Sequence, residues 1–198
     1  MVNFLVWLML ILIALVELFL LFSLGEHICS LRFRHQYPSV SCCRGHGREI
    51  INLITTYYPN AKIAVDIGAG YGRLARAMSH VRGIKVIAIE NMWFSFYIMR
   101  ILNFFFCARN VSAVYADAFQ YIKNSPYMFD IGVAYLGPVM NKRLKDLSKK
   151  FHVMISLDVE IPDMHATRIV DIPDGGYTHY HHVGKFPHRL YVYEINKF

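Results

Sequence analysis

A group of glycines follows an aspartate in a stretch that is otherwise apolar. Residues 66–73 read Asp-Ile-Gly-Ala-Gly-Tyr-Gly-Arg, so that Asp66 precedes Gly68, Gly70 and Gly72 in the pattern D-x-G-x-G-x-G. Because glycine has no side chain, a ligand can approach the backbone closely, and a helix that begins at the turn offers its N-terminal amides. The pattern therefore predicts a turn that binds a small molecule.

The segments on either side of this turn have the periodicity of a strand and of a helix. Residues 63–67 form a short, apolar, β-branched run of the kind found in buried parallel strands. Apolar residues then recur at helical spacing, at Leu74, Ala75, Met78 and Val81. A further helix is expected at 49–58, and strands at 86–89, 113–116, 129–135, 153–157, 167–172, 177–183 and 189–195. We expect an α/β fold for residues 49–198: a doubly wound, Rossmann-like mixed sheet with helices on both faces and an antiparallel edge.

Acidic residues follow the second and third expected strands. Glu90 ends the second strand, about 24 residues after Asp66, and Asp117 follows the third. A carboxylate in the position of Glu90 can accept two hydrogen bonds, as a ribose diol requires. A nicotinamide dinucleotide site would need a glycine where the chain has Arg73, so the motif argues against such an enzyme. A Rossmann-like domain without a cofactor is the other alternative.

Together these motifs resemble the class I S-adenosylmethionine-dependent methyltransferases. Residues 66–73 are similar to motif I of that family, whose glycine turn lies against the cofactor. The resemblance implies that Glu90 binds the ribose hydroxyls and that Asp117 contacts the adenine edge. It implies S-adenosyl-L-methionine as cofactor, bound by Asp66, Gly68, Ala69, Gly70, Gly72, Arg73, Glu90, Asn91, Asp117 and Ala118.

Other features narrow the resemblance to the small protein-lysine N-methyltransferases of the class I fold. They are the short chain, the apolar N-terminus and residues 129–144, although Ala69 and Tyr71 stand where that group often has Ser and Asp. The resemblance implies methyl transfer to a lysine of a membrane-associated protein. Tyr135 is the expected catalytic residue because of its position at the end of the fourth expected strand. The alternative role for Tyr135 is that of a packing aromatic. The alternative functions are methyl transfer to a lipid or quinone-like small molecule, and an inactive binding protein of the same fold.

Nucleic acid is not an expected partner, in spite of the basic charge. The (N/D)-P-P-(Y/F/W) motif of enzymes that methylate nucleic-acid amino groups is absent, since residues 135–138 read Tyr-Leu-Gly-Pro. The histidines His179, His181, His182 and His188 have no acidic or cysteine partner at ligand spacing, so we predict no metal site.

The N-terminal segment predicts a membrane anchor. Residues 4–24 are almost continuously apolar, with Glu17 as the only charge, and about 20 such residues cross a bilayer as a helix. A signal peptide and a buried core helix are the alternatives, but no basic residue precedes the apolar run as a signal peptide would require. We expect an anchor at 1–25 and a juxtamembrane linker at 26–48.

The basic residues predict which side of the membrane the domain occupies. The chain has 21 Lys and Arg residues against 14 Asp and Glu residues, and no Lys or Arg precedes Arg32. Arg32, Arg34, Arg44 and Arg48 follow the anchor closely, which favours a single-pass protein with its domain on the cytoplasmic side, near anionic headgroups. Residues 92–107 are strongly aromatic but too short to span, so we expect a core helix there or one that lies on the bilayer.

Overall fold

The computed structural model describes residues 2–32, 42, 44–172 and 188–196 and divides the chain into two units, Met1–Pro38 and Ser39–Phe198. The first unit contains helix α1, Val2–Arg32. Its stretch Phe4–Leu21 has a mean hydropathy of 2.9 and none of it is buried. Among the described helices, α1 alone is long and apolar enough to cross a membrane, a criterion that a signal sequence also meets.

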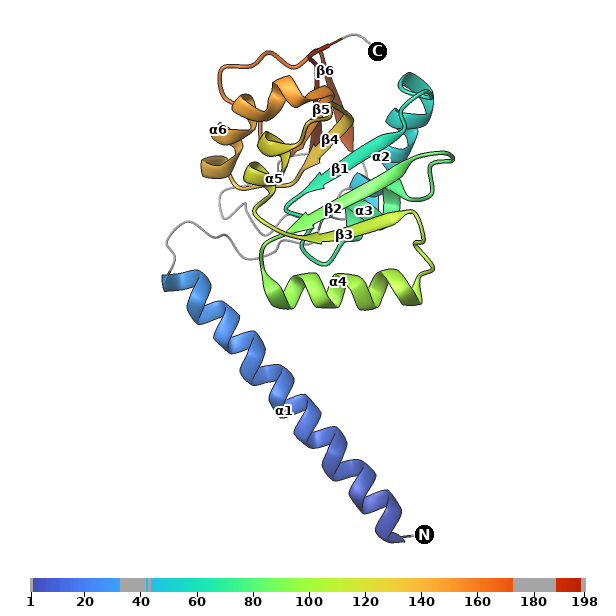
Figure 1. Ribbon diagram of the computed structural model, residues 1–198, viewed down its shortest axis with the longest axis vertical. Coiled ribbons are helices and arrows are strands. Elements are labelled where there is room, and N and C mark those ends of the chain that lie inside the picture. Colours follow the sequence, from blue (N-terminus) through green and yellow to red (C-terminus); the bar gives the residue numbers. More distant parts are fainter. Residues whose placement is uncertain (1, 33–41, 43, 173–187, 197–198) are drawn as a thin grey trace. The chain divides into compact units, whose positions relative to one another are not determined.

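The described part of the second unit forms a seven-stranded sheet in the order β3-β2-β1-β4-β5-β7-β6 (Figure 1). Five strands are parallel, and β7 runs antiparallel to both of its neighbours, β5 and β6. The strands are β1 Ile63–Ile67, β2 Lys85–Glu90, β3 Val111–Tyr115, β4 Phe129–Ala134, β5 Phe151–Leu157, β6 Arg168–Ile172 and β7 His188–Glu194. The predicted doubly wound sheet with an antiparallel edge is confirmed. The strand expected at 177–183 lies outside the described residues.

Helices cover both faces because successive strand residues point to opposite sides. On one face, Ala64 and Val86 pack in a core with residues of α2 (Arg44–Tyr57), α3 (Arg73–Met78) and α4 (Trp93–Phe105). On the other, Val65 and Ile67 pack with residues of α5 (Ala118–Asn124) and α6 (Pro138–Leu147). A 3₁₀ turn, η1 (Ser148–Lys150), leads from α6 into β5. The central strands β1, β4 and β5 are mostly buried on both faces and are correspondingly apolar, whereas β3 at the edge of the sheet is partly exposed.

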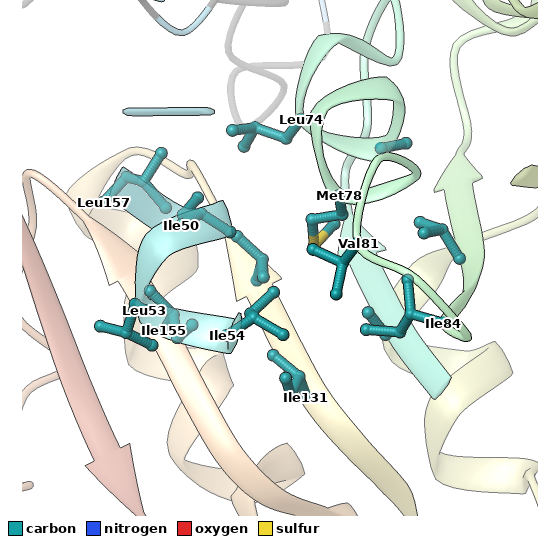
Figure 2. Packing of buried hydrophobic residues seen from close by; sticks show 14 of the residues in the cluster. Ile50, Leu53, Ile54, Leu74, Met78, Val81, Ile84, Ile131, Ile155 and Leu157 are labelled. Atoms are coloured by element: carbon teal, nitrogen blue, oxygen red, sulfur yellow. The ribbon is translucent and has the colours of Figure 1, made fainter. Parts of the chain in front are cut away.

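Figure 2 shows the first of these cores at close range. Ile50, Leu53 and Ile54 of α2 lie over strands β4 and β5, near Ile131 and Ile155. In the same view, α3 contributes Leu74 and Met78. The helices therefore hold the turn that precedes α3 firmly against the sheet.

Two helices extend into the segment 26–48, which was expected to be a linker. Helix α1 continues to Arg32 and α2 begins at Arg44, so the ends of the segment 26–48 are helical. Gly47, within this segment, has a packing role. A Cβ atom at Gly47 would lie 2.9 Å from the Cβ of Ala77, so glycine lets α2 pack closely on α3.

Candidate functional site

The glycine turn connects β1 to α3 and has a backbone that only glycine adopts readily. Gly68, Gly70 and Gly72 have φ angles of 72°, 54° and 73°, all in the left-handed region. A Cβ atom at Gly72 would also lie 2.5 Å from Cγ of Met99, and one at Gly68 would lie 2.9 Å from Leu136. The turn is therefore both conformationally restricted and tightly packed from behind.

Asp66 supports the turn from inside the protein. Its side chain is 1% exposed, and Oδ2 accepts a hydrogen bond of 2.9 Å from the backbone N–H of Ala75, in the first turn of α3. Burial raises the pKa of Asp66 to about 7, with a smaller contribution from the nearby Glu90, while the bond from Ala75 acts in the opposite direction. Asp66 thus satisfies an amide that the helix itself leaves unpaired. Direct contact between Asp66 and a cofactor stays a prediction.

Glu90 holds the turn at the carboxyl end of β2. One carboxylate oxygen accepts from the amide of Gly70 at 2.6 Å and the other from the amide of Met92 at 2.7 Å. The amides of Gly68 and Ala69 both donate to the carbonyl of Ile89. Glu90 therefore orders the turn from the carboxyl end of β2, with each of its two oxygens bound to a backbone amide.

The remaining predicted residues at this edge lie beside Glu90. The amide of Ala116 donates to the carbonyl of Glu90 at 3.1 Å, which places the end of β3 next to the end of β2. Asp117 is the N-cap of α5 and accepts from the amide of Gln120 at 3.0 Å, and Ala118 is buried. Asn91 directly follows Glu90 and is exposed. The structure thus brings Gly68–Gly72, Glu90, Asn91, Asp117 and Ala118 to one edge of the sheet.

Arg73 is engaged elsewhere. Its Nη1 donates a hydrogen bond of 2.8 Å to the carbonyl of Cys42, and its side chain lines a pocket with residues of α2 and α3. The side chain of Arg73 thus links α3 to Cys42, and binding of a cofactor by Arg73 stays a prediction.

Tyr135 immediately follows β4 and contacts a group of residues that the sequence did not predict. Its ring lies 5.4 Å from the ring of His46, which is fully buried. His46 Nε2 lies 3.2 Å from Asp158 Oδ1, and His188 Nδ1 lies 2.8 Å from Asp158 Oδ2. The backbone amide of Arg189 also donates to Asp158, at 3.0 Å. Burial raises the pKa of Asp158, but the bonds from His46, Arg189 and His188 outweigh this and bring the pKa below its usual value.

His188 has an acidic partner in space that local spacing does not indicate. It is Asp158, 30 residues earlier in the chain. His46 is 112 residues from Asp158, so no local spacing could have indicated the cluster. The one available signal was the position of Asp158, directly after an apolar strand. His179, His181 and His182 lie outside the described residues.

Comparisons with known proteins place the fold. No family model matches the chain, and no curated protein matches its sequence. Among solved structures, an RNA methyltransferase from Salinibacter ruber in complex with S-adenosyl-L-homocysteine has a TM-score of 0.64 at 17% identity, covering 80% of this chain and 95% of that one. A putative RNA methyltransferase from Pyrococcus horikoshii has a TM-score of 0.60 at 13% identity, covering 82% and 93%.

An O-methyltransferase from Bacillus cereus in complex with SAH has a TM-score of 0.53 at 17% identity, covering 67% of this chain and 64% of that one. The chain shares its fold with these methyltransferases. At such identities the similarity establishes the fold, and the acceptor of each enzyme is a property of that enzyme.

Proposed function

We propose that the protein transfers a methyl group from S-adenosyl-L-methionine. The observation that carries the proposal is the bond between Glu90 and the amide of Gly70, which orders a glycine turn beside an acidic strand end. This turn lies at the carboxyl end of β1, and the order of the strands reverses between β1 and β4. Such a switch point is where doubly wound folds bind their ligands.

The residues at this edge fit the cofactor chemically. Glu90 offers acceptors to a ribose diol, the glycine turn admits close approach to its backbone, and Asp117 offers a carboxylate to an adenine amino group. The bound cofactor supplies an electrophilic methyl group on a sulfonium. The protein has to align donor and acceptor in line and to keep the attacking atom unprotonated, so positioning supplies most of the acceleration.

For the acceptor, we propose a lysine side chain of a membrane-associated protein. The proposal is supported by the apolar helix α1 in the same chain and by Tyr135 at the carboxyl end of β4, next to the proposed cofactor site. A free lysine has a pKa near 10.4, and an apolar channel next to a sulfonium favours the neutral amine. Lipid, quinone-like and RNA acceptors are alternatives, and two of the similar structures are described as RNA methyltransferases.

Cofactor binding is tested by calorimetry on the detergent-solubilised full chain. We expect micromolar binding of S-adenosylmethionine, weakened by about tenfold or more in Glu90→Gln. The matched control is Asp130→Asn, because Asp130 Oδ2 also accepts two backbone amides, those of Lys62 and Ile63, but at the amino end of β1. An unchanged affinity in Glu90→Gln, or no binding by the wild type, would overturn the proposed function.

The acceptor is tested with labelled cofactor. Membranes and total RNA from the source cells are incubated separately with the full chain, and the label is separated into protein, lipid and RNA fractions. Label in protein, found on lysine after hydrolysis, supports the lysine proposal. Label only in lipid or only in RNA replaces it with that acceptor while leaving methyl transfer intact.

A further inference from the structure

Three metal-ligating side chains from distant parts of the chain meet at one end of the sheet. His46 comes from α2, Asp158 follows β5, and His188 begins β7, the strand next to β5. Their side chains are 0%, 7% and 4% exposed. Burying two imidazoles and a carboxylate together is costly unless each is paired. In this cluster both imidazoles are hydrogen-bonded to the carboxylate of Asp158.

The distances within the cluster are close to those of a metal centre. The two histidine nitrogens lie 3.2 Å and 2.8 Å from oxygens of Asp158, and all the potential ligand atoms lie within 4.8 Å of one another. A tetrahedral zinc ion with bonds of about 2.0–2.2 Å holds its ligand atoms roughly 3.3–3.5 Å apart. Small side-chain rotations would therefore bring the three ligands around one ion.

We propose that His46, Asp158 and His188 form a binding site for a divalent transition metal ion of the zinc class. Two imidazoles and one carboxylate are a nitrogen and oxygen set that such ions prefer, and these three ligands from the described residues leave a fourth position for another group. In the arrangement seen, each imidazole nitrogen that faces Asp158 donates to the carboxylate. When a metal binds, a neutral ring moves that proton to its other nitrogen.

The fourth ligand position of the metal would lie near the site proposed for methyl transfer. The ring of Tyr135 contacts His46, so the metal would lie near the end of β4, close to the expected methyl acceptor. An acceptor oxygen or nitrogen could occupy the fourth position and be oriented there. This consequence rests on the proposed function, whereas metal binding itself does not.

Metal content tests the proposal directly. The full chain in detergent is stripped with a chelator, loaded with zinc chloride, desalted, and measured by plasma mass spectrometry. We expect about one zinc ion per wild-type chain. Asp158→Asn and His188→Gln should each retain about one tenth of that amount or less. Two variants are controls that should keep the metal. One is Asp171→Asn, whose exposed carboxylate pairs with Arg189; the other replaces His179, His181 and His182 together by Gln.

A measurement on the wild type keeps the test independent of folding defects in the variants. Cobalt(II) is added in place of zinc, and its visible spectrum reports a tetrahedral site with nitrogen and oxygen ligands. Circular dichroism checks that each variant folds. The absence of a tetrahedral cobalt spectrum together with no retained zinc would show that the cluster is a hydrogen-bonded unit only and would overturn the proposal.

Zinc that survives both cluster variants, or that disappears only in the triple histidine variant, would overturn it as well. Binding of S-adenosylmethionine is measured on the same stripped and loaded samples. A protein that binds the cofactor but no metal refutes only the metal site, and one that binds metal but no cofactor refutes only the proposed function.

Discussion

The residues of the glycine turn have different tasks, although they form one motif. Gly68 and Gly72 are required by backbone conformation and by what packs behind them, Asp66 holds the first turn of α3, and Glu90 holds the turn itself. The motif thus has a structural role in addition to the binding role that we propose for it. This predicts that substitutions in it act on stability and on binding to different extents.

Gly72→Ala tests the packing behind the turn. Its Cβ would lie 2.5 Å from Met99 at a φ of 73°, so we expect a loss of about 2–4 kcal/mol in the free energy of unfolding. Gly83→Ala is the control, since Gly83 has a φ of 83° and nothing within 4 Å of the added Cβ. Urea denaturation should show a smaller loss for Gly83→Ala, of about 1 kcal/mol. Equal losses would mean that the contact with Met99 costs nothing.

Asp66 predicts a pH dependence of stability. Its pKa is about 7 in the folded protein against 3.8 for the ordinary carboxyl, so the folded state binds the proton more tightly. The stability that this provides is complete below about pH 4 and is lost as the pH rises through 7, with a slope of up to about 1.4 kcal/mol per pH unit. Asp66→Asn removes the titration but keeps an acceptor for Ala75. The free energy of unfolding, measured by urea denaturation at pH values from 4 to 8, should vary less with pH in the variant than in the wild type. The same pH dependence in both proteins would contradict the expectation.

At the scale of elements, α4 combines a buried face with an exposed aromatic one. Phe96 and Met99 pack in the core, while Phe104, Phe105 and the following Phe106 are 79%, 73% and 67% exposed. The predicted helix is confirmed, and its core face explains why an aromatic segment follows β2. Packing does not explain three exposed phenylalanines in succession, which are typical of a surface that meets lipid.

We expect this end of α4 to contact the bilayer. A variant lacking residues 1–38 should bind anionic vesicles weakly in a sedimentation assay, and Phe104→Ser with Phe105→Ser should reduce the bound fraction severalfold. Tyr127→Ser with Met128→Ser is the matched control, because both residues are also exposed but precede β4. Equal binding by the two double variants would exclude a specific contact through α4.

At the scale of the whole molecule, one apolar helix precedes the seven-stranded α/β sheet of the described residues. Helix α1 meets the criteria of a membrane span and also those of a signal sequence. Whether the mature protein keeps this helix distinguishes the two. We expect that protein isolated from membranes keeps residues 1–25, resists extraction with carbonate, and has the intact mass of 23.0 kDa, as an uncleaved anchor requires. A lower mass, together with a protein that is found in the soluble fraction, would identify a cleaved signal peptide instead.

The sequence by itself determined the order of the described elements and which residues meet at the carboxyl edge of the parallel strands. Strand runs, helical periodicity and the D-x-G-x-G-x-G pattern are local, and the carboxyl ends of parallel strands must meet at one edge once the sheet forms. Glu90 and Asp117 could therefore be placed from their positions after strands.

Only the tertiary structure decided which residues from distant parts of the chain contact one another. Gly47 belongs to a helix because α2 packs closely on α3, and Arg73 binds the carbonyl of Cys42. The cluster of His46, Asp158 and His188 joins segments up to 142 positions apart. Such contacts depend on which helix covers which strand, and no spacing along the chain encodes that.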